Sequence, residues 1–183
     1  MTIHLSIQEL EIGLPFIKQS PSLEGTVDLI VRRPAVDERE VILQGKVDLQ
    51  TGLEGDNWFA RGSKSTLDGS ADPGAQFTLM NSRVIQLLTQ DQALWQWAGD
   101  QLYVDLDLSE ENLPAGARLS IGTAIIEVTA KPHTGCKKFS ARFGQDALKF
   151  ISAPENKALR LRGINTRVIQ SGEFKVGDRI RKI

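Results

Sequence analysis

Short apolar runs, each bounded by glycine, proline or aspartate, fill most of the sequence and limit the folds that it can adopt. In GTVDLIVRR, the apolar residues Val27, Leu29 and Val31 recur at every second position. In ARLSIGTAIIEVTAKP, a turn at Gly122 and Thr123 separates two such runs, which is typical of a β-hairpin. Many short strands with few, short helices predict a mostly β fold, either a barrel or a sandwich, with small helical insertions.

Local patterns also predict where the chain departs from these strands. Residues 62–75, GSKSTLDGSADPGA, are small and polar and predict a long surface loop. QFTLMNSRVIQLL, residues 76–88, predicts extended chain, and TQDQALWQWAGD predicts a short helix that Thr89 caps and Gly99 ends. KKFSARFG and QDALKFIS have helical spacing and are separated by Gly144. The last segment, GINTRVIQSGEFKVGDRIRKI, predicts a strand, a Ser-Gly turn and a short strand.

Composition indicates an ordinary globular protein of one domain. The chain has 183 residues, 25% of them charged, and a formal net charge of −1, which does not favour nucleic-acid binding. The start, MTIHLSIQELEIGLP, lacks the basic and long apolar regions of a signal peptide, and no stretch is long and apolar enough to span a membrane. One cysteine cannot form an intramolecular disulfide. We therefore expect a cytoplasmic protein with no nucleic-acid or membrane partner.

The single cysteine, Cys136, lies in a strongly basic segment, AKPHTGCKKFSARFG. Between Lys131 and Arg162 the chain carries eight basic residues and two acidic ones, whereas the segment from Gly99 to Asn112 carries five acidic residues and no basic one. A local positive field favours thiolate over thiol and attracts anions such as phosphate. Cys136 also precedes a predicted helix, another environment that favours thiolates. These features predict a functional thiol.

Other interpretations of this segment remain open at this point. A lone cysteine is often a small buried apolar residue, although polar neighbours such as Thr134 and Lys137 speak against that here. A Cys–His nucleophile is disfavoured because His133 is only three residues from the thiol, whereas such pairs come from distant segments. Structural zinc needs four ligands, more than one cysteine and two histidines provide. His133 is expected at the surface or supporting the site.

Five segments occur in an order that resembles a known family. They are GLEGDNW (52–58), NSRVIQLL (81–88), GDQLYVDLDLSEENLPAGARLSIGTAIIEVTA (99–130), GCKKFSARFG (135–144) and RGINTRVIQSGEFKVGDRI (162–180). This order resembles the MOSC domain, named for the C-terminal domain of molybdenum cofactor sulfurase. The resemblance covers residues 25–183 and leaves residues 1–24 as an N-terminal extension packing on the domain. It implies a β-barrel-rich α+β fold, a MOSC-type barrel with a few short helices.

The family resemblance also implies a site. Cys136 would be the catalytic centre and the ligand of molybdenum in a molybdopterin cofactor, because a thiolate is a soft ligand suited to that metal. Neighbouring basic and polar residues would hold the cofactor's phosphate and pterin; the candidates are Lys137, Lys138, Arg142, Arg162, Arg83, Asn81, Asp56, Asn57 and His133. Many stand-alone relatives have a histidine after the GLEGD-type turn, and this chain has none there. Pyridoxal phosphate belongs to a separate large domain of full-length sulfurases and is not expected.

Three functions are compatible with such a site. The first is an oxidoreductase that binds molybdenum cofactor and reduces N-hydroxylated compounds, with electrons from a partner reductase. The second is a sulfur carrier or sulfurtransferase, in which a partner cysteine desulfurase loads Cys136 with a persulfide. The third is a non-catalytic protein that binds or delivers the cofactor. The first two act on a small molecule. No iron–sulfur or dinucleotide motif is visible in the sequence, so electrons would have to come from another protein.

Overall fold

A closed seven-stranded β-barrel is the centre of the structure, a computed structural model that describes residues 4–183. Around the ring, the strands follow the order β11, β7, β8, β9, β5, β6, β1, and β1 pairs again with β11. Their bounds are β1 (Glu24–Arg32), β5 (Phe77–Asn81), β6 (Leu102–Asp105), β7 (Arg118–Ile121), β8 (Ala124–Val128), β9 (Ile164–Gln170) and β11 (Arg179–Lys182). Closure gives every barrel strand two neighbours, so none of the seven exposes a free edge at its paired residues.

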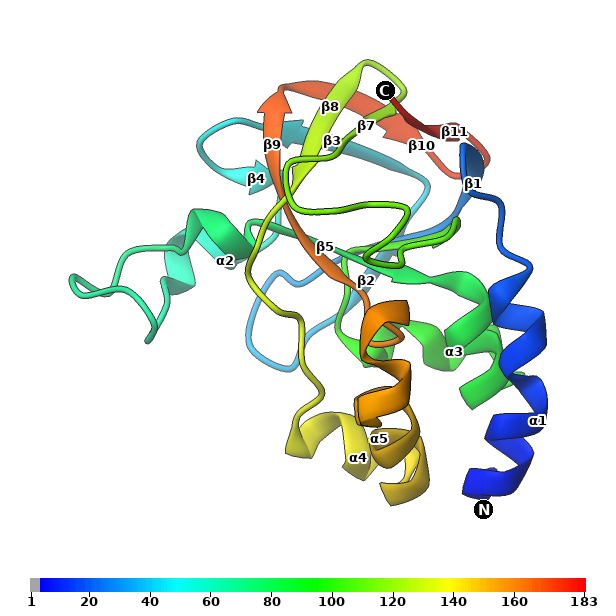
Figure 1. Cartoon of the computed structure of the whole chain (residues 1–183). Helices are drawn as coiled ribbons and strands as arrows, with labels where there is room; N and C mark the ends of the chain where they lie inside the picture. Colours follow the sequence, from blue (N-terminus) through cyan, green and yellow to red (C-terminus); the bar gives the residue numbers. More distant parts are fainter. Residues whose placement is uncertain (1–3) are drawn as a thin grey trace.

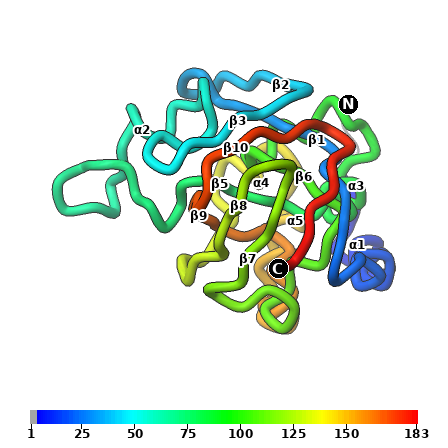
Figure 2. The backbone as a smooth tube through the Cα atoms, turned by 90° about the horizontal axis from the view of Figure 1, so that it is seen from above, coloured from blue at the N-terminus to red at the C-terminus, as the bar shows by residue number. Residues whose placement is uncertain are grey.

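A second, smaller sheet and one extra strand extend the barrel. Strand β2 (Glu40–Ile42) pairs with the end of β1, and β10 (Gly172–Lys175), β3 (Gln44–Asp48) and β4 (Gly52–Leu53) form the three-stranded sheet. The segment that follows β4 contains α2 (Trp58–Arg61) and the polar residues 62–75. Figures 1 and 2 both show this segment projecting away from the barrel. It therefore forms the long surface loop that its composition predicts, with one short 3₁₀ turn, η1 (Pro73–Ala75), at its end.

Alternating apolar residues fill the barrel. Strand β8 buries every second residue, and its Ile126 packs with Phe77, Leu102, Leu119 and Ile180 in one core of fully or almost fully buried side chains. A strand directs successive side chains to opposite faces, so this alternation turns one face of each strand inward. The barrel interior is thus a packed hydrophobic core.

A second core lies outside the barrel, under the helices. Figure 1 shows α1 (Ile7–Lys18), α3 (Ser82–Leu88), α4 (Lys137–Phe143) and α5 (Gln145–Ser152) gathered at one end of the molecule. Leu10 and Ile17 of α1 are buried there, and α1 contacts both α3 and α5. Ser6 and Glu9 form a capping box at the start of α1, which fixes where this helix begins. The first three residues of the expected N-terminal extension lie outside the described residues.

Three inserted segments at the helical end bring distant residues together. The β1–β2 connection carries residues 33–39, and the β5–β6 connection carries α3 and the 3₁₀ helix η2 (Gln92–Ala98). The β8–β9 connection carries α4, α5 and the 3₁₀ helix η3 (Pro154–Leu159). Strands β5 and β6 are parallel, which requires a crossover connection, and this crossover carries η2 to the start of β6. The site described below lies where these three connections meet.

Most predicted elements are confirmed, and two are wrong. The hairpin at Gly122 pairs β7 with β8, and Gly144, at φ 95°, separates α4 from α5. Residues 82–88 form helix α3 rather than extended chain, because the Asn81 side chain accepts the Arg83 backbone N–H as an N-cap. The cap of η2 is Asp91, which accepts the Ala93 N–H, and not Thr89. The structure also adds β11 after β10.

Within residues 4–183, the longest helices fall short of the length and apolar character needed to cross a bilayer.

The closing strand β11 provides a test of the barrel. Ile180 is completely buried and lies opposite Gly25 of β1 and Ile121 of β7, whereas Ile183, just beyond β11, is 63% exposed. Ile180→Ala should lower the free energy of unfolding by about 2 to 5 kcal/mol, through lost burial and the cavity left behind. Ile183→Ala should change it by less than about 0.5 kcal/mol. Urea denaturation of both variants measures the difference, and equal effects would contradict barrel closure through β11.

Candidate functional site

Cys136 is the N-cap residue of α4 and is exposed to solvent. Its backbone is extended, and its carbonyl accepts hydrogen bonds from Phe139 N at 3.0 Å and Ser140 N at 3.2 Å. Phe139 and Phe143 bury the other face of α4 in the second core, with their ring centroids 4.9 Å apart. The helix is therefore fixed to the protein while the thiol faces outward. The interpretation of Cys136 as a buried apolar residue is wrong.

Beneath the loop that leads to Cys136, the buried carboxylate of Asp100 contacts the imidazole of His133 and the guanidinium of Arg162. Asp100 is fully buried; its Oδ1 lies 2.6 Å from His133 Nε2 and its Oδ2 accepts from Arg162 Nη1 at 2.5 Å. Burial alone raises the pKa of Asp100, but Arg162 and His133 outweigh it and leave the pKa below its usual value. Asp100 is therefore a carboxylate, which can only accept hydrogen bonds.

His133 is consequently a neutral imidazole with a defined orientation. Burial lowers its pKa, the Arg162 charge lowers it further, and Asp100 compensates only in part. Since Asp100 can only accept, Nε2 carries the proton and Nδ1 carries the lone pair. Of the two positions predicted for His133, at the surface or supporting the site, the structure shows the second: its side chain is only 16% exposed and contacts Asp100 beneath the loop.

Three arginines contact the C-terminal end of η2, which consists of Trp97, Ala98 and the C-cap residue Gly99. Each of the three carbonyls accepts a hydrogen bond from a different guanidinium: Trp97 O from Arg142 at 2.6 Å, Ala98 O from Arg162 at 2.9 Å and Gly99 O from Arg33 at 3.2 Å. Carbonyls at a helix C-terminus carry partial negative charge and attract cations. The carbonyls at the end of η2 thus bind guanidinium groups from both the β1–β2 and the β8–β9 connections.

A fourth guanidinium, that of Arg39, joins this group without a matching carboxylate. Arg39 and Arg142 lie over the Trp97 ring, at 5.9 Å and 5.3 Å from its centroid. Within residues 4–183, no carboxylate lies within ion-pair distance of Arg39. Burial lowers the pKa of Arg39, and repulsion by Arg142 and Arg33 lowers it further. We call Arg33, Arg39, Arg142 and Arg162 the arginine cluster.

Two donors of the arginine cluster are unused. In the described part of the chain, the buried Nε of Arg39 and of Arg162 have no hydrogen-bond partner. A methyl group placed on Gly99 would lie 3.9 Å from Arg39 Nη2 and 4.0 Å from Arg162 Nη2. Gly99 has φ 99°, a conformation that favours glycine, and it lies next to both guanidinium groups. This is an arrangement that an anion satisfies.

The GLEGD turn contributes to the cluster through Asp56. Gly52 and Gly55 adopt φ 76° and 80°, as a tight turn requires. The Asp56 carboxylate accepts from Arg33 Nε at 2.8 Å and Nη2 at 2.9 Å, and its side chain is fully buried. Asp56 therefore holds Arg33 in place and is committed to that pair. Asn57 is the N-cap of α2, and its buried Oδ1 has no partner in residues 4–183.

The remaining predicted residues divide between the site and the rest of the fold. Lys137 and Lys138 are exposed on α4, and Lys138 Nζ lies 2.5 Å from Asp37. Arg83 pairs with Asp105 at 2.7 Å and donates to Phe16 O, so it ties α3 to β6 and α1. Asn81 donates to Ser20 Oγ and Leu106 O. Neither Arg83 nor Asn81 contacts the arginine cluster, Asp100 or Cys136 through a hydrogen bond.

A pocket of about 530 Å³ opens beside the same loop. Its walls are Glu110, residues 129–135, the end of α5 with η3, and residues 160 and 162–165 at and before the start of β9. His133 and Arg162 line it, as does Gly135; Cys136 itself does not. The thiol therefore stands at the next position along the loop, outside the pocket wall.

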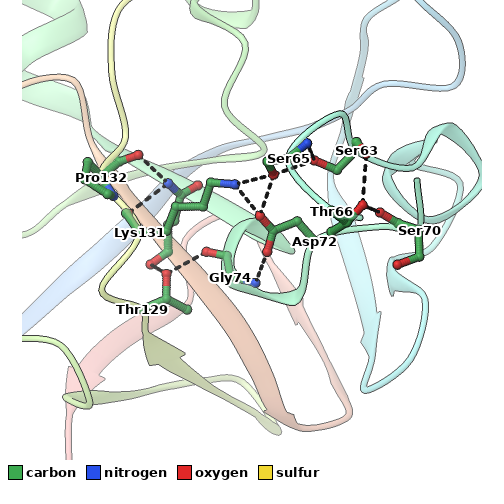
Figure 3. A network of polar contacts seen from close by, with 10 residues as sticks. Ser63, Ser65, Thr66, Ser70, Asp72, Gly74, Thr129, Lys131 and Pro132 are labelled. Atoms are coloured by element: carbon green, nitrogen blue, oxygen red, sulfur yellow. Dashed lines mark hydrogen bonds and ion pairs between the residues drawn. The ribbon is translucent and has the colours of Figure 1, made fainter. Parts of the chain in front are cut away.

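Polar contacts fasten the projecting loop to the pocket rim. Figure 3 shows Lys131 contacting Ser65 and Asp72, while Thr129 Oγ1 donates to Gly74 O at 2.6 Å. Lys131 Nζ lies 2.9 Å from Ser65 Oγ. Lys131 lines the pocket, so this network positions one of the pocket's cations and neutralises it with Asp72.

Sequence inspection missed four residues that shape the site: Arg33, Arg39, Trp97 and Asp100. Each lies in a connection far along the chain from Cys136, and the barrel closure brings these connections together. In the sequence, Gly99 and Asp100 appear at the end of a predicted helix and at the start of an acidic segment, and no local pattern distinguishes a buried aspartate from an exposed one.

Comparison with known proteins places the chain in a family. The profile of the MOSC domain matches residues 74–181, more than half of the chain. The protein therefore belongs to the MOSC domain family, which is associated with molybdenum-cofactor binding, and the family expected from the sequence is confirmed. The matched range begins after the GLEGD turn. No curated protein matches the sequence.

Solved structures share the fold at low sequence identity. The YuaD protein from Bacillus subtilis has a TM-score of 0.59 and 16% identity, over 86% of this chain and 94% of that one. YiiM from Escherichia coli has a TM-score of 0.56 and 18% identity, over 88% and 70%. YiiM from Geobacillus stearothermophilus has a TM-score of 0.52 and 15% identity, over 89% and 74%. At these identities the likeness establishes the barrel fold alone.

The buried imidazole predicts how stability depends on pH. The lowered pKa of His133 means that the unfolded chain takes up a proton first as the pH falls below 6.5. The stabilisation is complete above that pH and is lost below it. Between about pH 7 and about pH 5, the wild type should lose up to about 2 kcal/mol more unfolding free energy than His133→Gln, whose amide can still donate to Asp100. Urea denaturation of both proteins at both pH values measures this difference. Equal losses would contradict a neutral, buried His133.

Proposed function

We propose that this protein binds a molybdenum–pterin cofactor through Cys136 and the arginine cluster, and that it reduces N-hydroxylated compounds. One observation carries the proposal: helix α4 begins at the exposed Cys136 and carries Arg142 of the arginine cluster, in which Arg39 has no carboxylate partner and two Nε donors, of Arg39 and Arg162, have no hydrogen-bond partner within residues 4–183. When bound, the cofactor supplies two-electron redox chemistry. Reduction of an N–OH group to N–H takes two electrons and two protons and releases water. The electrons come from a partner reductase.

The residues present fit such a cofactor. Cys136 provides the one thiol of the chain, a soft ligand for a metal that brings sulfur ligands of its own. Within residues 4–183, no group of three or more His, Cys, Asp and Glu side chains is arranged to hold a metal ion. Cys136 would therefore be a single protein ligand for a metal that an organic cofactor already holds.

The arginine cluster would hold the anionic part of the cofactor. The Nε donors of Arg39 and Arg162 have no partner within residues 4–183, both guanidinium groups lie next to Gly99, and Arg142 lies nearby over Trp97. Asp100 orients Arg162, and Asp56 orients Arg33, so these two guanidinium groups are held before any ligand arrives. Planar guanidinium groups match phosphate oxygens with paired hydrogen bonds. Lys137 and Lys138 add positive charge along α4.

Exposure of Cys136 favours a second candidate, a sulfur carrier. A persulfide on an exposed thiol is accessible to a partner desulfurase that loads it and to an acceptor that removes it. A thiol in this position could act as the nucleophile for sulfur transfer. This function needs no bound metal, so the two candidates give different results in one experiment.

The molybdenum content of the purified protein tests the proposal. Produced in a host that makes the cofactor, the wild type should contain nearly stoichiometric molybdenum by elemental mass spectrometry. Cys136→Ala should lose it by at least about tenfold, because even residues that only support a metal ligand affect metal affinity by that factor. Ser140→Ala, on the same helix, serves as the control. A wild type without molybdenum but about 32 Da heavier by one sulfur at Cys136 would favour the carrier instead.

The arginine cluster has a prediction of its own. Arg39→Gln should lower cofactor affinity roughly ten- to hundredfold, since a hydrogen bond to a charged group contributes about 1.5 to 3 kcal/mol. Arg118→Gln is the matched control, because Arg118 is 54% exposed and pairs with Glu127 on the barrel. Molybdenum retained after prolonged dialysis measures the effect. Retention equal to that of the control would remove Arg39 from the site.

A further inference from the structure

The pocket of about 530 Å³ has the size and composition of a small-molecule site. Apolar side chains form much of its wall, among them Pro132, Ile151, Pro154 and Ile164. Ile151 and Ile164 also belong to the buried cores, so this wall is fixed by the fold. Arg162 lines this pocket and also belongs to the arginine cluster, so the pocket adjoins the proposed cofactor site at this residue.

His133 presents an unused acceptor in this pocket. Its Nε2 is committed to Asp100 at 2.6 Å, and it is the neutral imidazole described above. In residues 4–183, Nδ1 has no hydrogen-bond partner, and it is not among the fully buried atoms that lack one. Since His133 lines the pocket, Nδ1 is a lone pair available to a ligand that donates an O–H or N–H.

Lys157 supplies an uncompensated positive charge to the same pocket. The other cations of the lining have partners: Lys131 pairs with Asp72, Arg162 pairs with Asp100, and Arg160 pairs with Glu110 at 3.8 Å and donates to Leu113 O at 2.6 Å. Glu110, the one carboxylate of the lining within residues 4–183, is thus held by Arg160. Lys157 is exposed on η3, and the described residues place no carboxylate within ion-pair distance of it. An anionic group entering the pocket therefore meets a free ammonium.

The geometry points to a binding site for a small organic anion that has an apolar ring or chain and one hydrogen-bond donor. The apolar wall covers the ring or chain, Lys157 pairs with the carboxylate or phosphate, and His133 Nδ1 accepts from the donor. Asp100 acts as a positioning residue, because it fixes the imidazole tautomer that leaves Nδ1 free. Gly135 places the bound molecule one residue from Cys136. The inference does not require that Cys136 bind molybdenum.

The three hydroxybenzoates are suitable probes. Each carries one carboxylate, one ring and one hydroxyl donor, and the isomers differ in the spacing between the two polar groups. Titration of the ¹⁵N-labelled wild type in the millimolar range should give saturable shifts of the amides of residues 129–135 and 151–165 with at least one isomer. Binding of that isomer should also shift the ¹⁵N resonance of His133 Nδ1, which a merely apolar contact would not do.

Matched probes and variants separate the contributions. The corresponding methoxybenzoate, which lacks the donor, should bind about three- to tenfold more weakly, and Lys157→Met should weaken the hydroxybenzoate by about tenfold. Lys149→Gln, on the exposed face of α5, is the control variant. The inference is overturned by the absence of saturable shifts for all isomers, by shifts confined to another surface, or by equal affinity of the hydroxy and methoxy compounds. Phosphorylated phenols in place of benzoates show whether a phosphate or a carboxylate is preferred.

Discussion

The buried carboxylate of Asp100 is the interaction on which the rest of the site depends. It lies two residues before β6 and holds His133 of the β8–β9 connection and Arg162 at the end of that connection. Removing one partner of a buried ion pair costs about 3 to 5 kcal/mol, because a charge is left without compensation. Asp100 therefore fixes the loop of Cys136 to the barrel and also fixes the tautomer of His133. A single side chain positions both the proposed cofactor site and the pocket.

The arginine cluster has an electrostatic cost that the fold alone does not remove. Four guanidinium groups converge on three carbonyls and two buried carboxylates. Burial, and after it repulsion by neighbouring guanidinium groups, lowers the pKa of Arg39 and also that of nearby Arg61. Helix-end carbonyls and the Trp97 ring offset part of this repulsion. A bound polyanion would offset the remainder. The excess of guanidinium groups over carboxylates in this cluster is a stronger argument for an anion site than the number of basic residues. Most of the other cations within residues 4–183 are paired.

Sequence patterns predicted the elements whose signal is local. Gly122 marks the β7–β8 hairpin, Gly144 separates two short helices, and the polar neighbours of Cys136 indicated an exposed thiol. Helix α3 was missed because its apolar and β-branched residues suit a strand as well as a helix. The side chain of Asn81, which caps the first turn, favours the helix. Arg39 and Asp100 could not be predicted as site residues, because only barrel closure brings their connections to the loop of Cys136.

The loop from Lys131 to Cys136 shows how one short segment can serve two surfaces. Its residues alternate between partly buried and exposed positions, as an extended chain requires: His133 and Gly135 face the protein, whereas Thr134 and Cys136 face solvent. Gly135 packs so closely on α5 that a Cβ there would lie 2.4 Å from Leu148 Cδ1 and force that side chain to move. This packing holds the register of the loop. A shift by one residue would turn the thiol inward and withdraw the imidazole from Asp100, so the same contact that buries His133 keeps Cys136 accessible.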